Sequence, residues 1–392
     1  MGVATEASPQ ASPFSLSEDQ RAIQQTAREF AAERIAPEAV RWDQDKHFPV
    51  EVLREAGTLG MGGVYVDERF GGSGLSRFDS ALVFEALATG CPSTAAYVSI
   101  HNMVAWMIDE FGDEQQRAHW LPGLCSMQRL GSYCLTEPEA GSDAGALSTG
   151  AVRDGDHYVV NGVKQFISGG GTSDVYVVMV RTGEPGAKGI SALVVDGASE
   201  GISFGAEERK MGWNTQPTRQ VVFTDVRVPV ANRLGAEGTG FKIAMSGLDG
   251  GRLSIGACSL GGAQAALDKS LDYVRERTAF GARIGDFQAV QFKIADMATD
   301  LEAGRMLLWR AASALDAKDP SATRLCAMAK RMTTDVGFTV ANEALQIHGG
   351  YGYLAEYGLE KIVRDLRVHQ ILEGTNEIMR LIISRGLLES QS

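Results

Sequence analysis

One glutamate near the C-terminal end of the sequence lies in a setting that suits acid–base chemistry. Glu373 follows two apolar residues, Ile371 and Leu372, and precedes Gly374. A carboxylate among apolar side chains loses solvation, which raises its pKa towards the range useful for a general base. The threonine and asparagine that follow could cap a helix beginning at once. From the residues alone, a solvated charge beside a helix is the commoner interpretation for a glutamate.

Two earlier segments have residue types that could hold a polar ring. In Tyr133–Asp143, Thr136, Ser142 and glycine-flanked amides could grip a heterocycle or a phosphate. In Lys164–Gly171, an aromatic residue, a hydroxyl and three glycines suit a stacked ring approached closely by the backbone. Taken singly, a proline–glycine turn and a strand entering a glycine turn explain these segments at least as well.

Several common catalytic motifs are missing from the sequence. There is no Walker A sequence, no GxSxG nucleophile elbow, and no HExxH or HxxxH spacing among the six histidines. The one dinucleotide-like pattern, Gly350-x-Gly352-x-x-Ala355, follows a helical run instead of a strand. We therefore predict neither a Rossmann NAD site nor a catalytic metal.

The hydrophobic period changes twice along the chain, which predicts an α+β fold of three parts. Helical periodicity holds from Ser15 to about Gln128, with a capping box at Ser17 and Gln20 and a buried helix over 94–111. From about 130 to 230, short β-rich runs alternate with turns at Asp154-Gly155 and Asn161-Gly162, which predicts an antiparallel β domain. Long helices then return over 241–277, 287–315 and 321–348, and the stripe of Phe292, Met297, Leu301 and Leu308 is expected to face a bundle core.

Length and charge limit the classes of protein. The 392 residues suggest two or three domains, which we place at 15–128, 129–235 and 236–392, after a disordered tail over 1–14. The net charge of −12 argues against binding to nucleic acid, and no segment is long and apolar enough to predict a membrane span. Five scattered cysteines without a CxxC pair suggest reduced thiols and, with no evident targeting segment, a cytoplasmic protein.

The motifs together resemble the signatures of the acyl-CoA dehydrogenase family, whose members remove α and β hydrogens from acyl-CoA thioesters. The likeness includes the three segments above, Arg277–Gly281 and Gln346–Gly350, and runs from about Leu16 to Leu388. It implies a helical domain, a β domain and a C-terminal four-helix bundle. It also implies bound FAD and Glu373 as the base that takes the α-proton while a hydride leaves the β-carbon.

The same resemblance assigns the remaining site residues. FAD contacts fall on Tyr133, Leu135, Thr136, Ser142, Phe166, Ile167, Ser168, Thr375 and Glu377. The adenine half of FAD is expected to meet Arg277, Phe287, Gln288, Gln346, Gly349 and Gly350 of a neighbouring subunit, which implies a homotetramer. Substrate contacts fall on Ser142, Asp249, Gly250, Gly251, Arg252, Leu372, Gly374 and Arg385. The family more often has Trp and Thr where this sequence has Phe166 and Ser168, which puts flavin tuning in doubt but not its binding.

Two positions refine the implied reaction. Some relatives carry their base immediately before a substrate-binding arginine; that position is Gly251 here and has no side chain, which leaves Glu373. Straight-chain relatives usually have Tyr before the base, whereas Leu372 leaves room for an α-methyl branch. Segments such as Gly212–Thr218 and Val368–Gly374 look like the isobutyryl-CoA branch of the family.

The implied function is therefore oxidation of isobutyryl-CoA to methacrylyl-CoA in valine breakdown, with electrons passed to an electron-transferring flavoprotein. Butyryl-CoA and 2-methyl-branched acyl-CoA remain alternative substrates. An acyl-CoA oxidase and a flavin-containing nucleic-acid binder are the alternatives of other classes, and the acidic charge disfavours the second.

Overall fold

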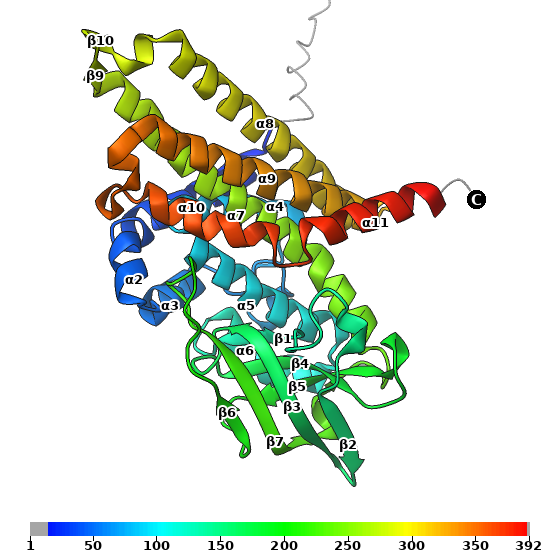
Figure 1. The fold of residues 1–392 in the computed structure, drawn as a ribbon. Helices are drawn as coiled ribbons and strands as arrows, with labels where there is room; N and C mark the ends of the chain where they lie inside the picture. Colours follow the sequence, from blue (N-terminus) through cyan, green and yellow to red (C-terminus); the bar gives the residue numbers. More distant parts are fainter. Residues whose placement is uncertain (1–14, 390–392) are drawn as a thin grey trace, which may run out of the picture.

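The structure is a computed structural model that describes residues 15–389 (Figure 1). The predicted tail over 1–14 lies outside the described residues. In Figure 1 the strands of the large sheet gather at the lower end, and the long helices α7 (Gly240–Glu276), α8 (Gln288–Asp316) and α9 (Ala322–His348) run side by side above them. The short strands β9 (Thr278–Ala279) and β10 (Ala282–Arg283) lie apart from the sheet, at the upper left.

The N-terminal part is helical, as the periodicity predicts. Its elements are α1 (Glu18–Phe30), the π-helix η1 (Ala31–Ile35), α2 (Ala39–Asp45), α3 (Val50–Thr58), the 3₁₀ turn η2 (Glu68–Phe70), α4 (Arg77–Gly90), α5 (Pro92–Phe111) and α6 (Glu114–Cys125). The capping box predicted for α1 is confirmed: Gln20 N donates to Ser17 Oγ and Ser17 N to Gln20 Oε1. Helix α5 is buried on nearly every side, as predicted for the apolar run over 94–111.

The middle part is one eight-stranded sheet. It comprises β1 (Gly131–Cys134), β2 (Gly150–Asp154), β3 (His157–Ser168), β4 (Val175–Arg181), β5 (Ile190–Asp196), β6 (Ile202–Phe204), β7 (Thr218–Pro229) and β8 (Arg233–Leu234), with short 3₁₀ turns at Ala144–Ala146, Ala187–Gly189 and Val230–Asn232. The strand order is β6-β7-β3-β2-β4-β5-β8, and β1 pairs with β4. Most neighbours are antiparallel, as predicted, but β4 pairs in parallel with both β1 and β2.

One of the two predicted turns is a bulge. The Asp154-Gly155 turn is confirmed, since Asp154 and His157 pair across it. Strand β3, however, continues through Asn161-Gly162, where its register against β7 shifts. Asn161 and Asp225 close this bulge with two hydrogen bonds of 2.9 Å. An asparagine–glycine pair indicates a backbone position with positive φ. A β-bulge contains such a position, as a hairpin turn does.

The C-terminal part is again helical. It contains α7 (Gly240–Glu276), the hairpin β9 (Thr278–Ala279) and β10 (Ala282–Arg283), η6 (Ile284–Asp286), α8 (Gln288–Asp316), α9 (Ala322–His348), η7 (Gly349–Tyr353), η8 (Ala355–Tyr357), α10 (Leu359–Arg367), η9 (Val368–Gln370) and α11 (Asn376–Glu389). The three long helices confirm the predicted bundle, and the shorter α10 and α11 both pack on α9. Met297, Leu301 and Leu308 are buried as predicted, but Phe292 is 62% exposed because no residue of α8 before Met297 is buried in the described chain.

Both helical parts share one hydrophobic core, in which α4 and α5 pack on α7. A close crossing makes this possible: a Cβ on Gly261 of α7 would lie 2.1 Å from the carbonyl oxygen of Glu85 in α4. Strand β4 joins the sheet to this helical body. Val175, Val177 and Met179 face α5, α6 and α7, while the alternate residues face the rest of the sheet. The packing of β4 on α5, α6 and α7 thus holds the sheet against the helices. The segment that follows η9 lines the cavity between the sheet and the bundle.

Candidate active site

Glu373 lies in a tight turn between η9 and α11. Its φ is +55° and that of Gly374 is +85°, so two successive residues adopt the left-handed conformation. A non-glycine residue in this region costs roughly 1 kcal/mol, which the surrounding contacts must offset. Helix α11 begins directly afterwards, and Thr375 Oγ1 accepts a hydrogen bond of 3.3 Å from Ile378 N. The turn thus lies directly before α11 and places the carboxylate against Gly251 of α7.

The carboxylate of Glu373 is desolvated. Its Oε2 atom is buried and has no hydrogen-bond partner among the described residues. Burial raises the pKa of Glu373 to about 7, although the charges of Arg252 and Lys330 act to lower it. Glu373 is therefore not the solvated surface charge of the alternative interpretation. Near neutral pH the carboxyl group can both lose and accept a proton.

Helix α7 supplies the wall opposite Glu373. A Cβ on Gly251 would lie 2.5 Å from Glu373 Oε2, so only glycine leaves room for the carboxylate here. Arg252 Nε lies 3.4 Å from the carbonyl oxygen of Glu373, and Arg252 also forms an ion pair of 2.6 Å with Asp249. Gly250 lies against the guanidinium of Arg77. Thus the glycine predicted to replace an alternative base directly faces Glu373.

A cavity of ≈ 900 Å³ opens between the sheet and the bundle beside Glu373. Twelve of the residues predicted from the sequence line it: Tyr133, Leu135, Thr136, Ser142, Phe166, Ile167, Ser168, Arg252, Leu372, Glu373, Gly374 and Thr375. Phe166 is 63% exposed and has φ +57°, so its ring has a face free at the cavity wall. Tyr133 Oη is buried and, like Glu373 Oε2, has no partner within the described chain. The cavity therefore presents two unmatched polar atoms and one unpacked aromatic ring.

A buried ion pair fixes the β-side wall of this cavity. Lys164 Nζ donates to Glu137 Oε1 at 2.7 Å and to the carbonyl oxygen of Leu135 at 3.1 Å. Ser148 N and Thr149 N donate to the same carboxylate at 2.6 and 2.9 Å. The segment from Leu135 to Glu137 is thereby tied to β3, two residues before Phe166.

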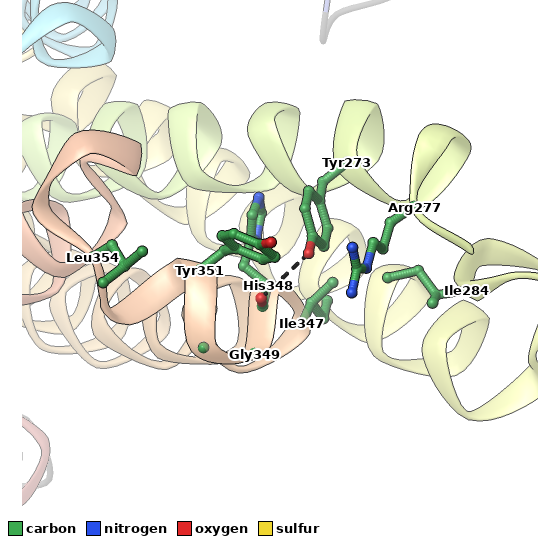
Figure 2. Close-up of a pocket in the computed structure, with 9 residues that line it drawn as sticks. Tyr273, Arg277, Ile284, Ile347, His348, Gly349, Tyr351 and Leu354 are labelled. Atoms are coloured by element: carbon green, nitrogen blue, oxygen red, sulfur yellow. Dashed lines mark hydrogen bonds between the residues drawn. The ribbon is translucent and has the colours of Figure 1, made fainter. Parts of the chain in front are cut away.

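The structure places a second group of predicted residues elsewhere. Arg277, Gly349 and Gly350 line a separate cavity of ≈ 450 Å³ where α7 and α9 end (Figure 2). In it Tyr273 stacks on His348 at 4.2 Å, and Arg277 lies over the Tyr351 ring at 5.4 Å. The other predicted residues that do not line the larger cavity are Asp249, Gly250 and Gly251 on α7, Phe287 and Gln288 at the start of α8, Gln346 on α9, and Glu377 and Arg385 on α11.

Some cavity residues were not predicted. Trp213 lines the cavity with φ +58°, and its Nε1 donates to His369 Nε2 at 3.1 Å. Lys330 on α9 is fully buried next to the base. No sequence pattern marked Lys330, because a lysine within a helical period usually lies in solvent. Trp213 lies in Gly212–Thr218, a segment singled out for its likeness to the family, but that likeness assigned no role to the residue.

Comparison with known proteins decides the family. Acyl-CoA dehydrogenase domain models match the chain in succession: the N-terminal domain over residues 17–128, the middle domain over 132–226 and the C-terminal domain over 238–388. The chain belongs to the acyl-CoA dehydrogenase family. It is therefore an oxidoreductase, and the α+β fold predicted from the sequence is confirmed.

Individual relatives agree with this assignment. The mitochondrial isobutyryl-CoA dehydrogenase of Bos taurus is 55% identical over 95% of this chain and 90% of its own length, and that of Dictyostelium discoideum is 57% identical over the same shares. The structure of butyryl-CoA dehydrogenase from Megasphaera elsdenii superimposes with a TM-score of 0.93 at 38% identity, covering 96% of this chain and all of that one.

No helix in residues 15–389 is long and apolar enough to cross a membrane. Within the same residues, no group of three or more His, Cys, Asp or Glu side chains is placed to hold a metal ion.

Proposed function

We propose that this chain oxidises isobutyryl-CoA to methacrylyl-CoA, with FAD as the bound cofactor and Glu373 as the base. The observation that carries the proposal is the Glu373 carboxylate, which faces the cavity without a partner and has a pKa raised to about 7. A thioester α-proton is weakly acidic, so its removal needs a base positioned out of water. The identity of 55–57% to isobutyryl-CoA dehydrogenases supports this substrate.

The cavity fits a flavin. Phe166 offers an aromatic face, Tyr133 Oη is an unpartnered hydroxyl, and Leu135, Thr136 and Ser168 lie on the same wall. FAD, when bound, supplies the acceptor for a hydride from the β-carbon. The ring contacts fall to Phe166, Ile167 and Ser168, and further contacts to Ser142, Thr375 and Glu377.

The residues of the chain perform the proton chemistry. Glu373 takes the α-proton on its free carboxylate, and the backbone N–H of Glu373 donates to the thioester carbonyl as negative charge develops there. Arg252 and Gly374 lie at the substrate side of the turn, and Asp249 orients Arg252 through their 2.6 Å ion pair. The closed wall at Gly251 keeps water from the carboxylate.

Leu372 supports an α-branched substrate. It lines the cavity immediately before the base, and a leucine leaves space that a tyrosine would fill. Butyryl-CoA and 2-methylbutyryl-CoA are the alternatives, and one methyl group in an apolar pocket changes specificity by about 1–3 kcal/mol. We therefore expect a preference and not strict exclusivity.

The separate cavity around Arg277 and Gly350 supports an assembly of several copies. In one chain these residues lie away from the base, so we propose that they bind the adenine half of FAD in a neighbouring copy of a homotetramer, together with Phe287, Gln288 and Gln346. Arg385 is proposed to contact the CoA part of the substrate. An electron-transferring flavoprotein is the proposed electron acceptor. The cytoplasmic location remains a prediction, since the two isobutyryl-CoA dehydrogenases are named as mitochondrial proteins.

The test is an anaerobic titration of the purified FAD-loaded protein. Isobutyryl-CoA, butyryl-CoA and isovaleryl-CoA are added in parallel, with free CoA as the control, and flavin absorbance is followed. The proposal expects the fastest loss of absorbance with isobutyryl-CoA. Fastest loss with another thioester would overturn the substrate, and no loss with any thioester would overturn the reaction. Rapid reoxidation by oxygen instead of by an electron-transferring flavoprotein would identify an oxidase.

A further inference from the structure

Lys330 is a fully buried lysine on α9, directly beneath the Glu373 turn. It forms no ion pair with any carboxylate of residues 15–389 within 4.0 Å. Its ammonium instead donates to the carbonyl oxygen of Gly374 at 2.8 Å and to Asn376 Oδ1 at 2.9 Å. A buried, unpaired cation is costly, so its position requires an explanation.

The turn that Lys330 contacts needs support. Glu373 and Gly374 are both left-handed, and each of their carbonyl groups is held by a cation from a different helix. Arg252 of α7 approaches the carbonyl of Glu373 at 3.4 Å, and Lys330 of α9 holds that of Gly374. Together they fix the peptide planes that orient the carboxylate.

The two flanks of the turn meet on the same face of α9. Gln370 before the turn and Asn376 after it both donate to Asp335 Oδ1, at 2.8 and 2.7 Å. Asn376 also donates to Thr334 Oγ1 at 3.0 Å. Lys330 and Thr334 share a face of α9, since they are four residues apart, and Asp335 is the next residue along the helix. This face clamps the segment from Gln370 to Asn376.

The charges around the carboxylate are few. Arg252 faces it from α7 but is already paired with Asp249, while Lys330 faces it from α9. Tyr65 and Tyr133 also interact with it, and burial raises the pKa of both phenols, so they are neutral. Burial lowers the pKa of Lys330 to about 8, so the ammonium remains mostly charged at pH 7. The charges of Glu373, Asp335 and Glu377 raise the pKa of Lys330, but none of these carboxylates forms an ion pair with it in residues 15–389. Lys330 is thus the cation near the base that no carboxylate pairs with directly.

We propose that Lys330 is the positioning residue of the catalytic base: it holds the Glu373–Gly374 turn through the Gly374 carbonyl and favours the ionised form of the Glu373 carboxylate. This inference rests on the proposed function, because it concerns the same proton transfer. In this role Lys330 touches neither substrate nor flavin, and it acts on Glu373 through the turn and through its charge.

The test is the pH dependence of flavin reduction by isobutyryl-CoA in the FAD-loaded wild type and in Lys330→Met. Without the cation the carboxylate binds its proton more tightly, so the acid limb should move up by about one pH unit. At pH 7 the ionised fraction of the base, and with it the rate, should fall about fivefold, and the KM should change less than kcat. Lys330→Gln removes the charge but keeps a donor, and serves if the methionine variant fails to fold. Lys330→Arg should keep the wild-type limb.

Lys361→Met is the matched control. Lys361 is a buried lysine of α10, paired with Asp365 at 2.6 Å and away from the Glu373 turn. Its loss should lower the melting temperature and leave the acid limb in place. An unchanged limb in both uncharged Lys330 variants, or an equal shift in Lys361→Met, would overturn the inference. A wild type that no thioester reduces would instead refute the proposed function.

Discussion

Two glutamates on opposite walls of the cavity show how partners, and not burial alone, decide the charge of a carboxylate. Glu137 is 4% exposed, and burial by itself would raise its pKa, but the charge and hydrogen bond of Lys164, with donors from Thr149 and Ser148, lower the pKa to about 2. Glu373 has no such donors on Oε2, and burial raises its pKa to about 7. Glu137 is a permanently charged structural group, whereas Glu373 can exchange a proton.

The largest expected effect is that of removing the base. Glu373→Gln keeps the shape of the side chain and removes the proton acceptor, so flavin reduction by isobutyryl-CoA should slow by about 10³-fold. Stopped-flow absorbance under nitrogen measures the rate. The variant should retain its flavin spectrum and should still bind the thioester. Retention of more than a tenth of the wild-type rate would mean that another group takes the proton.

Glu137→Gln should act on stability. It leaves Lys164 buried without its counter-ion, which costs about 3 kcal/mol or more. A lower denaturation midpoint is the readout, and the double change Glu137→Gln with Lys164→Met should recover part of the loss. The pKa of Glu137 is lowered in the folded state, so its contribution is present above pH 4.5 and lost as the pH falls towards 2. If Glu137→Gln is as stable as wild type, the ion pair does not hold the wall.

Gly251→Ala tests the space that the carboxylate occupies. The added Cβ would lie 2.5 Å from Glu373 Oε2, so the side chain must move, and kcat should fall by about tenfold. Gly304→Ala on α8 is the matched control, because its nearest contact would be a leucine methyl at 3.3 Å. Equal activity of the two variants would show that the carboxylate can move away from the added methyl group without loss of function.

Leu372→Tyr should have the smallest effect on the total rate and should act on substrate choice. Tyrosine fills the space beside the α-carbon, so the ratio of isobutyryl-CoA to butyryl-CoA turnover should fall by about tenfold. The two substrates, measured with the same enzyme preparation, control for each other. An unchanged ratio would mean that Leu372 does not determine the preference between these two substrates.

The sequence predicted the long helices and singled out Glu373 as the candidate base because both inferences rest on local patterns. Helices α5, α7, α8 and α9 follow from their apolar period, and Glu373 from its apolar neighbours and the family motif. Asn161-Gly162 was wrong as a turn because a bulge uses the same backbone conformation. The prediction of Phe292 as a core residue was wrong, because no residue of α8 before Met297 is buried by the described chain.

The contacts between distant segments could not be predicted. That Lys330 meets Gly374, that Trp213 meets His369, and that Gly251 faces Glu373 all depend on how α7, α9 and the sheet pack. Periodicity assigns a residue to a face of its helix, but it does not identify the segment that packs there. By contrast, the separation of Arg277 from Glu373 was implied by the family resemblance, which assigned Arg277 to a neighbouring subunit, and it follows from the length of α7.

The most direct test of the account is the pH dependence of flavin reduction by isobutyryl-CoA in the wild-type enzyme. Because the pKa of Glu373 is raised to about 7, the rate should rise about tenfold per pH unit up to that value and then level off. A rate that is flat from pH 5 to pH 9 would contradict a desolvated Glu373 as the base.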